Sequence, residues 1–126
     1  MGNSWQYRYD TGWINRTDWT NVHLGSNTTL NTDSNVTHNL NAPLSNLLVK
    51  LFVSTDGTDA NSFEVGTAVF NDATSRSVNF TTYQIDLNNI KIQTGLSGLY
   101  YQIDDGTIIL LDNENYYYKA KVYFLG

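Results

Sequence analysis

The sequence predicts an all-β protein built as an antiparallel β-sandwich, and three observations predict it. Of 126 residues, 16 are Asn, 15 Thr, 9 Ser and 9 Gly, whereas the helix former Glu occurs only twice. This composition favours short strands and turns over helices. Apolar and polar residues alternate along several segments, as they do in half-buried strands. Turn-forming clusters recur roughly every 8–12 residues, which is the spacing typical of sandwiches.

The first third of the chain opens on strict alternation. Residues 5–9 (Trp-Gln-Tyr-Arg-Tyr) place aromatic side chains on one face and polar ones on the other, and residues 10–12 then turn the chain. Residues 25–35 are polar and indicate a loop with a weak edge strand. Residues 41–43 contain the single proline, which ends a strand because it cannot donate to a sheet ladder. Strands are expected here over 5–9, 13–14, 19–24 and 36–40.

The most apolar segment spans residues 47–53. A period of two places Leu47, Val49, Leu51 and Val53 on one face, which we expect in the core, and Leu48, Lys50 and Phe52 on the other. The second face is half apolar, which is unusual for the solvent side of a monomer and favours a subunit contact. Residues 54–62 (Ser-Thr-Asp-Gly-Thr-Asp-Ala-Asn-Ser) follow as a turn cluster.

The second half contains the clearest hairpin signal. Asp105-Gly106 lies between two apolar runs within residues 99–111, and this dipeptide is typical of tight primed turns. In the last strand, Tyr118, Ala120, Val122 and Phe124 share one face, and Lys119, Lys121 and Tyr123 share the other. Strands are expected over 63–70, 78–87, 90–92, 100–103, 107–111 and 116–125.

Length, charge and composition exclude several functions. The formal net charge is −5, so the chain has no electrostatic footprint for nucleic acid or an anionic membrane. No apolar run approaches the roughly 20 residues that span a bilayer, and residues 1–10 do not resemble a signal peptide. The absence of cysteine excludes disulfides and thiol chemistry. We expect one domain over residues 1–126, with no nucleic-acid partner and no membrane insertion.

No motif indicates catalysis, and no cofactor is expected. His23 and His38 lie on predicted strands outside any recognisable motif, so structural or surface roles are favoured. A glycosidase pair would need two suitably placed carboxylates, yet most acidic residues lie in turns, where Asp is expected for backbone reasons. Residues 56–61 and 112–114 contain oxygen ligands suited to calcium. Neither fits the helix-loop-helix spacing, and turn chemistry explains both without a metal.

The aromatic residues give the strongest indication of function in this sequence. Sugars bind proteins through aromatic faces that cover C–H surfaces and through short polar side chains that meet hydroxyls, which matches Tyr and Trp set among Asn and Asp. The alternative is that most of these aromatic residues belong to the core or to an interface. The candidates for ligand binding are Trp19, Asp56, Asp59, Asn61 and Tyr101. The candidates for burial between subunits are Leu48, Phe52 and Tyr123, and no metal ligand is assigned.

Three stretches together resemble small distal domains of bacteriophage tail fibres and receptor-binding proteins. Residues 9–13 (Tyr-Asp-Thr-Gly-Trp) resemble their opening motif, and residues 36–40 (Val-Thr-His-Asn-Leu), followed by Pro43 and a β-run at 48–53, resemble their middle element. Residues 90–95 (Ile-Lys-Ile-Gln-Thr-Gly) and 116–123 resemble their closing strands. Each motif is weakly specific by itself, but their order and spacing cover most of the chain.

This resemblance implies an H-type-lectin-like sandwich that assembles as a homotrimer and binds terminal sugars in surface grooves. It implies a C-terminal fibre tip on the virion, outside the cell, whose partners are copies of itself and a host cell-surface polysaccharide or glycan. The matched motifs are scaffold, so no sugar-binding residue is carried over. Two alternatives remain: a purely structural domain that trimerises or caps the fibre, and, less favoured, a glycan-degrading enzyme.

Overall fold

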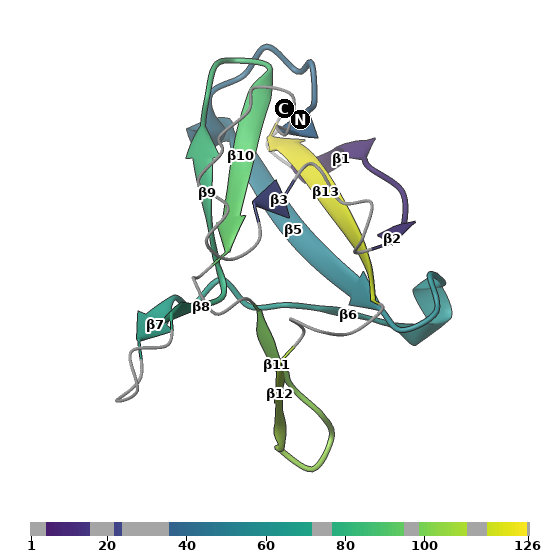
Figure 1. Cartoon of the computed structure of the whole chain (residues 1–126). Coiled ribbons are helices and arrows are strands. Elements are labelled where there is room, and N and C mark those ends of the chain that lie inside the picture. The colour runs from purple at the N-terminus through teal and green to yellow at the C-terminus, as the bar shows by residue number, and fades with distance from the viewer. Residues whose placement is uncertain are drawn as a thin grey trace.

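The computed structural model describes residues 5–15, 22–23, 36–71, 77–94, 99–110 and 116–125. Within these ranges the regular structure is almost entirely strand, with two single-turn 3-10 helices, so the predicted all-β class is confirmed (Figure 1). The strands are β1 (Trp5–Asp10), β2 (Ile14–Asn15), β3 (Val22–His23), β4 (Val36–Thr37), β5 (Leu47–Ser54), β6 (Ser62–Glu64), β7 (Phe70–Asn71), β8 (Ser77–Val78), β9 (Phe80–Gln84), β10 (Asn89–Thr94), β11 (Tyr100–Gln102), β12 (Ile108–Leu110) and β13 (Tyr117–Leu125). The 3-10 helices are η3 (Leu44–Asn46) and η4 (Asp59–Asn61).

The larger sheet has five antiparallel strands. Its order is β1-β13-β5-β6, and β2 also pairs with β13. The long pairing of β13 with β5 sets Tyr118 opposite Val53 and Ala120 opposite Leu51. All four of these side chains are buried, so the predicted inner faces of both strands are confirmed. β6 is the last strand of this path, beyond β5.

The second sheet is built around β10. β4 and β3 pair with successive parts of one edge of β10, and β9 pairs with the other edge. Ile90 and Ile92 point into the interior and are fully buried. The β10–β3 pair is parallel, with Ile92 opposite Val22, so the expectation of antiparallel strands throughout is wrong at this point. A period-two pattern predicts which side chains share a face of the sheet, but it does not predict the direction of the strand. The connection of nearly 70 residues between β3 and β10 is long enough to allow either direction.

Both sheets contribute to one buried cluster. The larger sheet supplies Leu51, Val53, Tyr118, Ala120 and Val122. The second sheet supplies Val36, Phe80, Ile90 and Ile92. Their burial removes apolar surface from water, which is the main favourable contribution to folding.

Two predicted strands are interrupted by irregular segments, and the strand expected over 36–40 covers only Val36–Thr37. The expected strand 63–70 is regular only in β6 and at β7, and the expected strand 78–87 is divided by Asn79. Asn79 has a positive φ of 68°, and its Nδ2 donates a 2.7 Å hydrogen bond to the Gly66 carbonyl. Asparagine tolerates this left-handed conformation better than most residues. One asparagine therefore interrupts its own strand and holds the irregular segment after β6.

The β11–β12 hairpin is confirmed, but its turn differs from the prediction. The connection contains three residues, Asp104, Asp105 and Gly106, and is closed by a 3.0 Å bond from Ile103 N to Thr107 O. Gly106 has φ 88° and its N–H donates to Ile103 O, whereas neither aspartate has a positive φ. A primed two-residue turn needs positive φ at one or both of its central positions, and here the single positive φ falls on the third residue of the connection. The position of the glycine in the turn was therefore predicted correctly, whereas the predicted turn type is wrong.

Candidate functional site: a groove between β6 and the β11–β12 hairpin

An open groove of about 890 Å³ separates β6 and its continuation from the β11–β12 hairpin, which projects away from the two main sheets (Figure 1). Its apolar wall consists of Phe63, Val65, Tyr101, Ile103 and Ile108. Its polar side chains are Thr55, Asn61, Glu64, Asn79, Gln102 and Asp104. A concave, largely apolar surface with a few polar groups is the usual form of a small-molecule site.

The groove exists because two strand ladders end beside it. The backbone contact between the β6 side and β5 ends with the bond from Val65 N to Leu51 O (3.0 Å), and the chain then leaves the sheet. Val65 is 2% exposed, so this departure stays packed on the core. Among the described residues, β11 pairs with β12 and with no strand of either main sheet.

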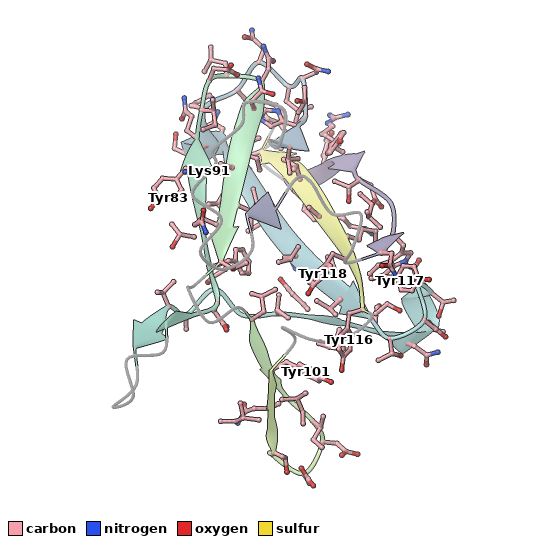
Figure 2. All side chains as sticks on the ribbon, in the orientation of Figure 1. Tyr83, Lys91, Tyr101, Tyr116, Tyr117 and Tyr118 are labelled. Atoms are coloured by element: carbon pink, nitrogen blue, oxygen red, sulfur yellow. The ribbon has the colours of Figure 1, made fainter. Side chains whose placement is uncertain are left out.

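Aromatic rings fix the hairpin against β6. The rings of Phe63 and Tyr101 are stacked, with centroids 4.4 Å apart and an interplanar angle of 27°. The Tyr101 and Tyr116 rings meet edge to face at 6.1 Å, and their hydroxyl oxygens are 2.8 Å apart, within hydrogen-bond distance (Figure 2). Phe63 and Tyr101 are both half-buried. Part of each ring therefore stays open to the groove while its position is held by its neighbours.

The turn 54–62 is held by its own polar side chains. The buried Ser54 Oγ accepts hydrogen bonds from the N–H groups of Gly57 and Thr58, at 3.0 and 3.1 Å. The Asp56 carboxylate accepts bonds from the Thr58 hydroxyl (2.7 Å) and from Asn61 Nδ2 (2.5 Å). These donors, first Thr58 and then Asn61, lower the pKa of Asp56 to about 2. Asp56 thus orients Asn61 at the rim of the groove.

Gly57 allows this turn to lie against β13. Its φ is 80°, and a Cβ built at this position would lie 3.2 Å from the Tyr117 ring. Glycine avoids both the left-handed strain and the steric conflict.

Asp59 faces away from the groove and anchors the turn to the larger sheet. Its Oδ1 accepts hydrogen bonds from Lys119 Nζ (2.7 Å) and from Trp13 Nε1 (2.8 Å). Lys119 Nζ also lies 4.6 Å from the Trp13 ring centroid and 3.8 Å from Asp10 Oδ2. The hydrogen bonds from Lys119 and then Trp13 lower the pKa of Asp59. Although Lys119 was expected on the outer face, it is only 7% exposed, because the turn and Trp13 cover it.

The structure brings together some of the predicted ligand-binding residues. Asn61 and Tyr101 line the groove, and Asp56 supports Asn61 from the adjacent turn. Asp59 belongs to the contact with Lys119 and Trp13, and Trp19 lies outside the described residues. Phe63, Gln102 and Asp104 also line the groove and were not predicted as ligand-binding residues. The sequence did carry a signal for the hairpin, because Ile103 and Ile108 are apolar residues on either side of an Asp-Gly turn. The structure leaves these two side chains 38% and 58% exposed.

The three candidate interface residues share the outer face of the larger sheet. Leu48 pairs directly with Tyr123 in the β5–β13 register, and Phe52 lies further along β5. Leu48 is 37% exposed, and Phe52 and Tyr123 are half-buried. Lysines lie among them: Lys121 Nζ is 5.9 Å from the Phe52 ring centroid and Lys50 Nζ is 6.0 Å from that of Tyr123. Burial of this face between subunits stays a prediction.

No group of three or more His, Asp or Glu side chains suited to a metal occurs in the described part of the chain. The turn at 112–114, considered for calcium, lies outside that part, as does the side chain of His23. His38 is buried, and its Nδ1 accepts a 3.0 Å bond from Leu40 N. Burial lowers the pKa of His38, and the charge of Asp86 partly opposes this.

Comparison with protein-family models, with curated proteins and with solved structures found no match for this chain. In the described ranges, no helix has the length and apolar character needed to cross a membrane.

Proposed function

We propose that this chain is a non-catalytic glycan-binding domain and that the groove between β6 and the β11–β12 hairpin holds the sugar. The observation that carries the proposal is the half-open Phe63–Tyr101 pair beside the side-chain amides of Asn61 and Gln102. An aromatic surface covers the C–H face of a sugar ring, and an amide both donates to and accepts from hydroxyl groups. The ring positions are set before a ligand arrives, so binding loses little entropy in ordering them.

We also propose that the domain forms the distal, extracellular tip of a viral tail fibre, where host attachment requires recognition of surface glycans. Support comes from the stretches that resemble tail-fibre domains, at residues 9–13, 36–40, 43, 48–53, 90–95 and 116–123. In this proposal the two sheets are the layers of an H-type-lectin-like sandwich. The half-apolar outer face with Leu48, Phe52 and Tyr123 makes the contacts of a homotrimer.

Glycan binding is tested by presenting the purified domain to an array of cell-surface polysaccharides and oligosaccharides, followed by titration calorimetry on the strongest ligand. Tyr101→Ala removes the ring and should weaken binding at least about tenfold, equivalent to roughly 1.4 kcal/mol. Tyr101→Phe keeps the ring and should retain binding within a few-fold, although it loses the hydroxyl contact with Tyr116. Tyr83→Ala removes an exposed tyrosine from β9, outside the groove, and serves as the matched control.

The outcomes separate the alternatives. A folded wild-type domain that binds no glycan would favour the purely structural role in trimerisation or capping. Shortening of a polysaccharide during prolonged incubation would establish catalysis and contradict the proposal. Equal loss of affinity in Tyr83→Ala and Tyr101→Ala would place the sugar elsewhere.

A further inference from the structure

We propose that the groove selects uncharged glycans and rejects anionic ones such as uronate-, sialate- or phosphate-bearing polysaccharides. This proposal rests on the proposed glycan-binding function and adds the ligand class. It follows from the charges that line the groove and from the positions of the basic residues.

Among the described residues that line the groove, those that carry a charge at neutral pH are both carboxylates, Glu64 and Asp104. Carboxylates carry negative charge at neutral pH. Asp105 follows Asp104 in the hairpin turn and adds a third negative charge next to the two in the wall. An anionic sugar seated on Tyr101 and Phe63 would bring like charges together in a partly desolvated space, where repulsion is strong.

The basic residues of the described part of the chain lie outside the groove wall, and Arg8 on β1 donates a hydrogen bond to Gln6 Oε1. Lys119 is buried against Asp59, Lys121 lies over Phe52, and Lys91 lies 4.7 Å from the Tyr83 ring centroid on the other sheet (Figure 2). Lys50 comes nearest, 3.8 Å from Glu64 Oε1, in an exposed pair. Exposed pairs contribute little, so Lys50 softens the charge of Glu64 without creating a binding site for an anion. Anionic sugars are usually held by such cationic groups, Arg above all.

The remaining groups in the wall suit an uncharged sugar. Val65, Ile103 and Ile108 offer apolar surface, and Asn61 and Gln102 offer groups that can donate and accept hydrogen bonds. The formal net charge of −5 also reduces the encounter rate with anionic polymers.

The test compares neutral and uronate-containing oligosaccharides of equal length and linkage by calorimetry. At low ionic strength the neutral ligand should bind at least about tenfold more tightly, and the difference should narrow near 0.5 M salt, where screening is strong. Asp104→Asn should reduce the difference several-fold by improving affinity for the anionic ligand. Asp86→Asn removes a carboxylate from the turn between β9 and β10, outside the groove wall, and should leave the difference unchanged.

Equal or tighter binding of the anionic ligand, with the affinity lost in Tyr101→Ala, would overturn the charge preference and leave the glycan-binding function intact. A difference that Asp104→Asn does not alter would overturn it as well. Binding of neither ligand, nor of any other glycan on the array, would overturn the proposed function itself.

Discussion

His38 shows how a single side chain links burial to protonation. It is 4% exposed, and its Nδ1 accepts a hydrogen bond from the N–H of Leu40, so the geometry assigns the proton to Nε2. No partner for Nε2 occurs among the described residues. A proton on Nδ1 would place two donors face to face. The folded state therefore favours neutral imidazole, which agrees with the lowered pKa of His38.

This geometry predicts that the protein loses stability as the pH falls. Because the pKa of His38 is lower in the folded state than its ordinary value of 6.5, the unfolded chain binds the proton first. The stabilising contribution is complete above about pH 6.5 and is lost as the pH falls below that value toward the folded-state pKa. Urea midpoints at pH 7.5 and pH 5.5 measure the effect. His38→Gln should show a smaller difference between the two midpoints, and an unchanged difference would contradict the assignment.

The predicted site residues differ in how far the sequence could specify them. Tyr101 and Asn61 were predicted from residue type alone, because an aromatic ring and a nearby amide suit sugars wherever they are exposed. The sequence could not show that Asp59 has a different role from these two residues, since its hydrogen-bond partners Trp13 and Lys119 are 46 and 60 residues away in sequence. A carboxylate in a turn looks the same in sequence whether its oxygens face solvent or a buried lysine.

The two faces of β5 should contribute differently to the free energy of unfolding. Leu51 is fully buried in the cluster that both sheets form, whereas Leu48 on the other face is 37% exposed. Leu51→Ala should lower the free energy of unfolding by about 2–5 kcal/mol, because it leaves a cavity as well as losing apolar burial. Leu48→Ala, the same substitution on the same strand, should cost less than about 1 kcal/mol when both substitutions are made in the Phe52→Asp variant, which is expected to be monomeric and so leaves this face uncovered. Chemical denaturation of both variants checks this, and equal losses would be incompatible with the observed faces.

The period-two pattern of the sequence predicted the long strands of the larger sheet correctly. The segments 47–53 and 116–125 were predicted with the correct inner faces because each has several residues of one period and a long partner. The segment 63–70 is also mainly apolar, but Asn79 donates a hydrogen bond to the Gly66 carbonyl and the strand ends. The side chain responsible lies outside the segment that it interrupts, so the pattern within 63–70 could not reveal it.

At the scale of the molecule, the proposed trimer depends on the outer face of the larger sheet. Phe52 lies on this face opposite Lys119 in the β5–β13 register, and Leu48 and Tyr123 lie opposite each other near the other end. In the proposed trimer this face would exchange water for apolar contact, which would account for three large side chains at partly exposed positions.

Light scattering should therefore give three times the mass of the single chain for the wild type. Phe52→Asp should give the monomer mass, because an uncompensated charge would be buried at the interface. Ile85→Asp places the same charge on an exposed residue after β9 and should remain trimeric. Circular dichroism confirms that both variants fold. A monomeric wild type, or a trimeric Phe52→Asp, would contradict the trimer.

The central place of β13 in the larger sheet also has a consequence for how the protein is made. Trp5 pairs with Leu125, and β13 lies between β1 and β5 in the sheet. The strands β1 and β5 are therefore synthesised well before β13, the strand with which both of them pair. Contacts this distant in sequence form slowly, on the scale of milliseconds to seconds. Until β13 is available, β5 exposes an unpaired, apolar edge that other nascent chains can bind. We therefore expect the chain to be most prone to aggregation during synthesis before residues 117–125 have emerged from the ribosome.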